Sequence, residues 1–480
     1  MRKIIIILAI FLPLKGLAQM DSIKAQYKAA FDQFRQEIGL EHKTFLSRND
    51  SLFHLFLKDS WKSFSIFKKE LDVKPKPVSQ PVVPDSLIMQ SRPTEIFPTD
   101  QHNSSFINSI ENLEIKTPNE TDFMGTFETS FDFYGSMHRV YAPGMLPFSF
   151  QLSGPNIEAY YAQTASLKGI TFLVSQLLEI KKKLRLNDWG YYKLTGSISE
   201  GLSPEKPEQQ LFHWILLLKS GYNAKIGYSG NNAYVLMPSR QEVYNLPSVR
   251  IGDSTYYIFD NSTSFTPSDR IIIHQADFPG NSSFSMEIGE IPAFIRKTTT
   301  KEIITGNQTV NISLDAILLN FMNDYPLCDM SVYFSAPLSS IAGESLDKIL
   351  EFRLKGKTVK QKVAYLLEFI QRSFPYMNDM EQFGGERYLF PDEVLHYPGS
   401  DCEDRAILFT RLVRRYTSLS CIGLDFPGHV SAAVCVEGEG DFLFVDGRKY
   451  LICDPTWLNA PVGYLPEEYK KMKPKIIRFE

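Results

Sequence analysis

Three short segments near the end of the sequence carry a cysteine, a histidine and an aspartate in that order. Cys402 lies in SDCEDR (400–405), His429 in PGHV (427–430) and Asp454 in CDPTW (453–457). A thiol at a helix N-terminus faces the positive end of the helix dipole, which favours the thiolate. An imidazole within reach would take the thiol proton and later protonate a leaving amine. A carboxylate on the far ring nitrogen would hold the imidazole in one tautomer. Together these residue types predict attack of a sulfur on an amide carbonyl.

The elements around these residues are predicted from the pattern of apolar residues and turns. A helix is expected from about 400 to 416, followed by strands at 419–424, 429–436, 442–445 and 449–453. The Asp446–Gly447 pair between the last two strands is a strong hairpin signal. The strand that starts at His429 could pair antiparallel with the strand that ends before Asp454. The start of the first strand would then lie opposite the end of the second. That pairing would bring the imidazole and the carboxylate together.

The three segments resemble the transglutaminase-like superfamily, in its exported bacterial branch. The matching runs are DCEDRAILF (401–409), GHVSAAV (428–434) and YLICDPT (450–456), preceded by FPDE (390–393). The resemblance covers roughly residues 345–480. It implies a papain/transglutaminase-like domain, in which a helix bearing the cysteine packs on an antiparallel sheet. It also implies Cys402 as nucleophile, His429 as general base and acid, and Asp454 as the orienting carboxylate. Many relatives carry an aromatic residue after the histidine, where this chain has Val430.

Two readings of Cys402 compete. Most lone cysteines are inert, buried small residues, and the carboxylates of Asp401, Glu403 and Asp404 would raise the thiol pKa if they pointed at it. Asp401 is expected to cap the helix, and Arg405 to neutralise a neighbouring carboxylate. The alternative to an enzyme is therefore a catalytically inactive binding or scaffold protein of the cell envelope.

The remaining parts of a catalytic site are less specific. The backbone amide of Cys402 is one natural oxyanion donor, and Gln382, Tyr388 or His396 could supply a second. Metal-ligand spacings and glycine-rich phosphate loops are missing from the sequence, so no metal and no cofactor are expected. Cys421, Cys435 and Cys453 lie on predicted strands, where a bridge between Cys435 and Cys453 is conceivable.

Composition excludes several classes of protein. The chain has 480 residues, which suggests two or three domains, and its net charge of −4 gives no reason to expect a nucleic-acid partner. Five cysteines are too few for a disulfide scaffold.

Residues 1–18 have the features of a signal peptide. A basic start is followed by an apolar run from Ile4 to Leu14 and by small residues before Gln19. The run is shorter than the roughly 20 residues of a membrane-spanning helix, and no later segment is long and apolar enough to span. We expect an exported protein, periplasmic or secreted, without a membrane span.

Upstream of the catalytic motifs, three further regions are predicted. Residues 19–73 show two apolar stripes at helical spacing, which predict a helical hairpin with a possible partner in the cell envelope. Residues 74–126 are rich in proline and polar residues and are expected to be an extended linker. Residues 127–344 are predicted to form an α+β middle domain, so the whole chain belongs to the α+β class.

Residues 150–262 could be a degenerate transglutaminase-like copy. They repeat the order of helix, strand and strand, and YYIFD (256–260) resembles YLICD (450–454). Aligning these two runs without gaps places Glu208 at the position of Cys402 and Val235 at the position of His429. Similarity between any helix followed by strands explains the pattern equally well.

The predicted reaction is acyl transfer at an amide through a thioester, with a protein or peptide as substrate. Water as acceptor makes the enzyme a peptidase or amidase, and a lysine amine makes it a crosslinking transglutaminase. Hydrolysis is favoured, because an exported enzyme meets water at far higher concentration unless its site excludes it.

Overall fold

The computed structural model describes residues 61–71, 76–84, 95–96, 126–144, 150–260, 270–275, 282, 284–305 and 308–479. Trp61–Glu480 forms one compact unit. The predicted signal peptide and residues 19–60 of the predicted hairpin lie outside the described residues. Within the described part, no helix combines the length and the apolar character needed to cross a membrane.

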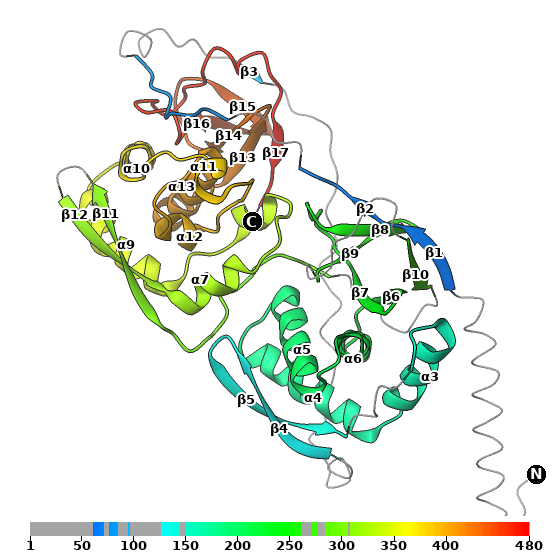
Figure 1. Cartoon of the computed structure of the whole chain (residues 1–480). Helices are drawn as coiled ribbons and strands as arrows, with labels where there is room; N and C mark the ends of the chain where they lie inside the picture. Colours follow the sequence, from blue (N-terminus) through cyan, green and yellow to red (C-terminus); the bar gives the residue numbers. More distant parts are fainter. Residues whose placement is uncertain are drawn as a thin grey trace, which may run out of the picture. The chain divides into compact units, whose positions relative to one another are not determined.

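The middle lobe, residues 126–275 with β1 and β2, is built from helices on an antiparallel sheet (Figure 1). The seven-stranded sheet has the order β1-β10-β6-β7-β9-β8-β2, and α6 packs on β7 and α5 on α6. Its strands are β1 (Trp61–Ser65), β2 (Phe67–Lys68), β6 (Lys225–Ser229), β7 (Asn232–Pro238), β8 (Pro247–Ile251), β9 (Ser254–Ile258) and β10 (Arg270–His274). The other elements are the hairpin β4 (Thr126–Phe133) and β5 (Ser136–Pro143), and the helices α3 (Gly154–Ala165), α4 (Lys168–Lys183), α5 (Asp188–Leu202) and α6 (Lys206–Lys219).

The C-terminal lobe, residues 298–479, carries the three motif segments. Its six-stranded sheet has the order β17-β13-β14-β16-β15-β3, and α13 packs on β13 and β14. The strands are β3 (Glu95–Ile96), β13 (Cys421–Phe426), β14 (His429–Val434), β15 (Phe442–Val445), β16 (Arg448–Cys453) and β17 (Lys475–Ile477), and a separate hairpin is made of β11 (Thr298–Thr305) and β12 (Gln308–Asp315). The helices are α7 (Ala316–Asn323), α8 (Ser331–Ser335), α9 (Ser340–Leu354), α10 (Val359–Ser373), α11 (Asp379–Phe383), α12 (Pro391–His396) and α13 (Cys402–Thr417). The predicted mixture of helices with antiparallel sheets is thus confirmed.

The prediction of a second helix in the N-terminal hairpin is wrong for the residues of that segment that the structure describes. Residues Trp61–Ser65 form strand β1, which pairs with β10 along its whole length. The Trp61 indole lies edge-on to His274, with ring centroids 4.9 Å apart, and its Nε1 donates a hydrogen bond to Glu158 at 2.6 Å. The open edge of the sheet offers this segment a full set of backbone partners, and aromatic residues suit a half-buried strand. Tertiary pairing therefore outweighs the helical spacing of its apolar residues.

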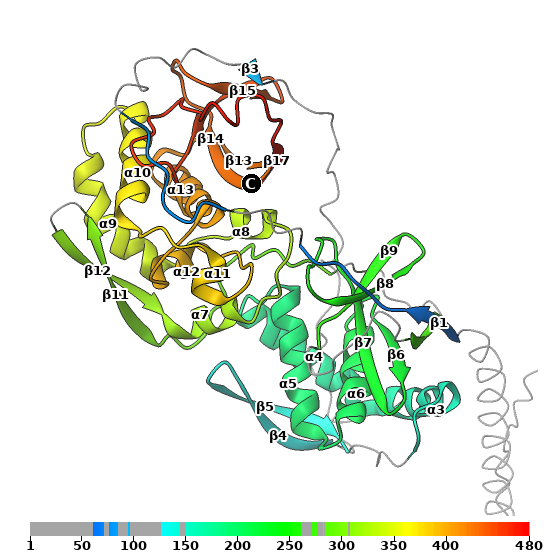
Figure 2. The same cartoon turned by 45° about the horizontal axis from the view of Figure 1, so that its top comes forward.

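Two predicted boundaries also change. The expected domain start at 345 falls inside α9, and β11 and β12 already pack on α9, α10 and α12, so the C-terminal lobe begins earlier in the chain. In the predicted linker, residues 76–84 do not run free between domains. They lie along the C-terminal lobe (Figure 2). Val83 of this segment is fully buried.

Local sequence explains how the motif segments are positioned. Pro427 and Gly428 form the two-residue connection between β13 and β14, in which Gly428 has a φ of 79° that favours glycine. His429 is therefore the first residue of β14. β14 is buried along its whole length, and the small side chain of Ala432, which lies in the same apolar cluster as the buried residues of α13, suits the close packing of α13 on this strand.

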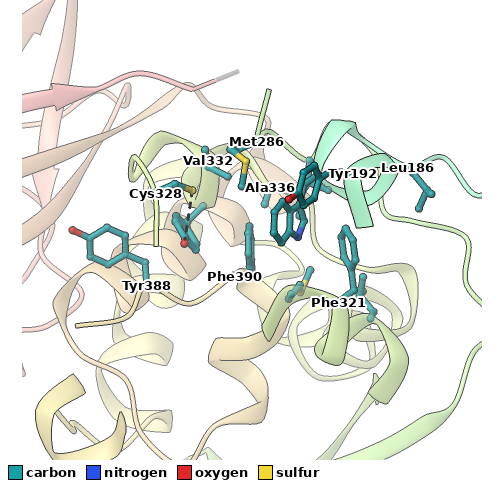
Figure 3. Packing of buried hydrophobic residues seen from close by; sticks show 14 of the residues in the cluster. Leu186, Tyr192, Met286, Phe321, Cys328, Val332, Ala336, Tyr388 and Phe390 are labelled. Atoms are coloured by element: carbon teal, nitrogen blue, oxygen red, sulfur yellow. Dashed lines mark hydrogen bonds between the residues drawn. The ribbon is translucent and has the colours of Figure 1, made fainter. Parts of the chain in front are cut away.

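The largest cluster of buried apolar residues includes side chains from both lobes. Figure 3 shows Tyr192 of α5 in the same cluster as Met286, Phe321 of α7 and Phe390, which precedes α12. This continuous core fixes the helices that lead into the motif segment at 400–405.

Candidate active site

His429 and Asp454 form a buried pair at the predicted place. β14 and β16 pair antiparallel, with Ala432 opposite Cys453, so the start of one strand lies near the end of the other. His429 Nε2 lies 2.6 Å from Asp454 Oδ2, and the side chains are 1% and 0% exposed. Asp454 Oδ1 accepts hydrogen bonds from the backbone N–H groups of Thr456 at 2.9 Å and Trp457 at 3.4 Å. The carboxylate is thus held by its own turn, with one oxygen left for the imidazole.

Cys402 lies beside this pair. It is the first residue of α13, and its Sγ accepts a hydrogen bond from the backbone N–H of Val430, next to His429, at 3.4 Å. The thiol donates to Glu403 Oε2 at 3.1 Å, and His429 Nδ1 has no hydrogen-bond partner among the described residues. The structure therefore brings the three predicted residues together, but the thiol hydrogen is directed to Glu403 rather than to the imidazole.

In this arrangement Cys402 is a neutral thiol, contrary to the expectation drawn from the helix dipole. Burial raises the pKa of Cys402 well above its usual value, and the charge of Glu403 raises it further, although Lys76 opposes this. The side chain of Cys402 is fully buried, and His429 beside it is buried as well. Loss of solvation, with a carboxylate in contact, outweighs the stabilisation from one helix terminus.

Lys76 is the main feature that the sequence did not reveal. Its ammonium group lies among four carboxylates, which we call the carboxylate cage: Asp379, Glu386, Asp401 and Glu403. Nζ is 3.0 Å from Asp401 Oδ2 and from Glu386 Oε1, 3.6 Å from Asp379 Oδ2, and in direct contact with Glu403 Oε1. A lysine in a proline-rich segment 325 residues from its partner Asp401 carries no local signal of this contact.

The electrostatics of the cage centre on the pair of Lys76 and Glu403. Burial opposes the charge of Lys76, yet Glu403 and Asp401 raise its pKa well above the usual value. Burial likewise opposes the charge of Glu403, but Lys76 lowers the pKa of this carboxyl group. Burial raises the pKa of Asp401, and the charge of Glu403 adds to this effect. The site thus holds a buried ion pair of Lys76 and Glu403 beside a carboxyl group, Asp401, whose pKa is raised.

Asp379, Asp401 and Glu403 also have the donor set of a cation site. One oxygen of each lies within 4.8 Å of the others, and all three residues are buried. The ammonium of Lys76 is bound to these same three residues and supplies a positive charge there.

Stability should fall with rising pH because of Asp379. Burial, with the charge of Glu403, raises its pKa to about 7, whereas an unfolded aspartate titrates near 3.9. Folding therefore takes up a proton between these values, and the resulting stability is present below about pH 4 and lost as pH rises through 7. In urea unfolding at pH 5 and pH 7.5, Asp379→Asn should remove about 2 kcal/mol of the difference seen in the wild type. Equal pH dependence in the two proteins would contradict this assignment.

The predicted oxyanion residues are placed differently from one another. Gln382 exchanges two hydrogen bonds with the backbone of Gly399, at 2.9 and 3.2 Å. The Tyr388 ring packs edge-on to Tyr333, with centroids 5.5 Å apart. His396 is the last residue of α12, and its ring packs against Tyr397. In the described part of the structure, these three side chains contact residues other than Cys402.

Tyr376 is a further candidate donor, which the sequence did not single out. Its hydroxyl group is buried and has no hydrogen-bond partner among the described residues. Burial raises the pKa of Tyr376. A backbone bridge to Ser400 ties Tyr376 to the residues that precede α13. The only feature of the sequence that could have indicated this donor is an aromatic residue upstream of Cys402.

Two expectations about the helix start need correction. Asp401 occupies the N-cap position of α13, but its side chain makes no cap hydrogen bond and binds Lys76 instead. Arg405 is fully buried, and its guanidinium donates to the backbone carbonyls of Phe374 and Ser400. Burial lowers the pKa of Arg405 to about 10, although the charges of Asp401 and Asp404 favour its protonated form. All five cysteines are free thiols, so Cys435 and Cys453 form no bridge.

The middle lobe has the same central strand order as the C-terminal lobe. β6-β7-β9-β8 corresponds to β13-β14-β16-β15, and β10 lies beside β6 as β17 lies beside β13, although β1 extends the first sheet beyond β10. The equivalence of individual residues differs from the ungapped alignment, because the connections between the elements differ in length. Ser229 pairs with Asn232 across a two-residue connection, as Phe426 pairs with His429. Asn232, rather than Val235, therefore corresponds to the histidine.

A carboxylate remains at the position of Asp454. Asp260 follows β9 and contacts Lys206 of α6, with 3.5 Å between Nζ and Oδ2. Asp260, Lys206 and the buried His213 line a cavity of about 210 Å³ between α5, α6 and the end of β9. The middle lobe therefore has a cavity and a carboxylate at the place that corresponds to the candidate site of the C-terminal lobe. It has no cysteine at the start of α6, the helix that corresponds to α13. A shared ancestry of the two lobes stays a hypothesis.

Comparison of the chain with protein-family models, with curated proteins and with solved structures found no match.

Proposed function

We propose that the C-terminal lobe is a cysteine-dependent acyl-transfer domain of the transglutaminase-like type. The observation that carries the proposal is the buried pair of His429 and Asp454, 2.6 Å apart, beside a cysteine at the start of a helix. The hydrogen bond from Val430 N to Cys402 Sγ supports it, since it ties the sulfur to the strand that presents the imidazole.

The chemistry would proceed in two steps. When the thiol turns from Glu403 to His429, the unpartnered Nδ1 can accept its proton. The thiolate then attacks the amide carbon, and the oxyanion would be stabilised by the Cys402 backbone amide and the Tyr376 hydroxyl. His429 gives its proton to the leaving amine, which leaves a thioester on Cys402. In the second step His429 takes a proton from water, which attacks the thioester and releases the acid and the thiol.

We favour a peptidase or amidase over a crosslinking enzyme, because water is far more concentrated than any amine outside the cell. The substrate would be a protein or peptide. The predicted signal peptide, residues 1–18, would direct the enzyme to the periplasm or the medium.

One observation favours a second candidate function. Cys402 is fully buried and burial raises its pKa, as in a structural cysteine. A lobe that keeps the fold but binds its partner without reaction would show these properties permanently. An enzyme would show them only while its site is closed.

Amide turnover with a thiol probe separates the two candidates. We expect a mixture of peptides to release amines or ammonia with the wild type, and iodoacetamide to stop the reaction while labelling Cys402 in peptide maps. Cys402→Ala should lose both turnover and this label, and His429→Ala should lose turnover by about 10³-fold. Cys435→Ala is the matched control, because Cys435 is a half-buried free thiol directly after β14. Turnover that persists in Cys402→Ala, or none in any protein, would favour the binding module.

A further inference from the structure

Residues 76–84 are bound to the C-terminal lobe in the way that a peptide ligand binds a groove. Val83 N donates to Leu458 O at 3.0 Å, and Leu458 N donates to Pro81 O at 2.8 Å. These bonds add a short extended segment to the loop that follows Asp454, which is a common mode of peptide recognition. Figure 2 shows this segment, in blue, crossing the lobe beside α10 and α13.

Side chains along the segment occupy separate subsites. Val83 is fully buried against Ala460, Tyr464 and Trp457. Gln80 Nε2 donates to the backbone carbonyls of Gln371 at 3.0 Å and Thr456 at 3.1 Å. Spacing of this kind, with backbone bonds for affinity and pockets for alternate side chains, is suited to reading a sequence.

The carboxylate cage forms the charged end of this groove. Four carboxylates surround the single ammonium of Lys76, and the side chains of Asp401 and Glu403 are fully buried. The buried carboxylate of Glu403, which contacts the ammonium group directly, is costly without a cation. The occupant of the cage must therefore be positive, and a compact ammonium on a long chain fits where Lys76 lies.

The groove also has free space beside the segment. A cavity of about 550 Å³ is lined by Gln80 itself, Gln371 and Leu458, and by residues of β11. Phe374 and Pro375, which lead directly to Tyr376, line it as well. The segment thus contacts the helix start that carries Cys402 through Lys76 and lines this cavity through Gln80.

We propose that residues 76–84 occupy the enzyme's own peptide-binding groove, and that the carboxylate cage is a subsite for a lysine side chain of an extended peptide. The inference deepens the proposed function and rests on it for the identity of the bound peptide as a substrate. In the form described here the groove is filled by the chain itself, and Cys402 is closed off. A substrate peptide with lysine in the cage position would displace the segment.

A peptide-binding experiment on the full chain tests the inference. The probe is a fluorescein-labelled peptide, KPVSQPVVP, with the sequence of residues 76–84. The triple variant Lys76→Ser, Gln80→Ser, Val83→Ser should release the segment and bind the probe with a Kd on the order of 10 μM. The wild type should bind it at least tenfold more weakly, because its own segment competes at high effective concentration. A peptide with norleucine in place of the lysine should also bind the triple variant at least tenfold more weakly.

Cys402 accessibility gives a second readout that does not depend on turnover. Iodoacetamide should label Cys402 at least tenfold faster in the triple variant than in the wild type, and the probe peptide should slow this labelling again. Labelling of Cys435 is the internal control and should not change. The single variant Lys76→Gln provides the same comparison if the triple variant does not fold.

The outcomes separate this inference from the proposed function. Equal binding of the lysine and norleucine peptides, or equal binding by wild type and variant, would overturn the inference even if Cys402-dependent turnover is found. Selective binding and protection of Cys402 without any amide turnover would support the inference and reject the enzyme.

Discussion

Asp454→Asn should lower amide turnover roughly 10³-fold while the thiol of Cys402 remains present. In the wild type, Asp454 Oδ1 is held by two backbone N–H groups and Oδ2 faces His429 Nε2 at 2.6 Å. Asparagine can keep its oxygen on the backbone donors only by turning its NH₂ group toward the imidazole. That group donates a hydrogen bond, so Nε2 must be unprotonated and Nδ1 would carry the proton. The nitrogen needed to accept the thiol proton is then blocked.

The measurement is the initial rate of amine release from peptides, compared between wild type and variant. Thr456→Ala is the matched control, because its backbone N–H still binds Asp454 while its buried hydroxyl is removed. We expect Thr456→Ala to keep at least about a third of the wild-type rate, since it leaves the imidazole tautomer unchanged. A variant Asp454→Asn with comparable activity would show that the pair of His429 and Asp454 has only a structural role.

Arg405→Met should lower the free energy of unfolding by about 3 kcal/mol or more. The guanidinium of Arg405 donates to the carbonyls of Phe374 and Ser400, and its Cζ lies 5.4 Å from the centre of the Tyr376 ring. Methionine fills much of the same volume but leaves both carbonyl groups without a donor. It also removes the positive charge that Asp401 and Asp404 favour at this position. Urea unfolding of the full chain at one pH measures the loss.

Arg372→Met is the matched control for this substitution. Arg372 is half exposed and pairs with Glu368 at 3.0 Å within one turn of α10. Surface pairs of this kind contribute less than about 1 kcal/mol, so the free energy of unfolding should barely change. Equal losses from the two substitutions would mean that the buried guanidinium does not anchor residues 374–400 to α13.

The structures of residues 61–65 and 76–84, which differ from those predicted from the sequence, depend on contacts with distant segments of the chain. Trp61–Ser65 has helical spacing, but the free edge of β10 draws it into a sheet. Residues 76–84 have the composition of a linker, yet Val83 is buried and Lys76 meets four carboxylates. Both errors concern contacts with residues far away in the chain, which local propensity cannot report.

The order of the sequence alone determined which residues meet at the candidate site. A cysteine at a helix start, and a histidine and an aspartate at facing strand ends, are local features that short-range turns and antiparallel pairing bring together. Only the tertiary structure decided their chemical state. Burial depends on what the rest of the chain places over the site, so the protonation of Cys402 and the cation in the carboxylate cage follow from the packing of Lys76 rather than from the motif itself.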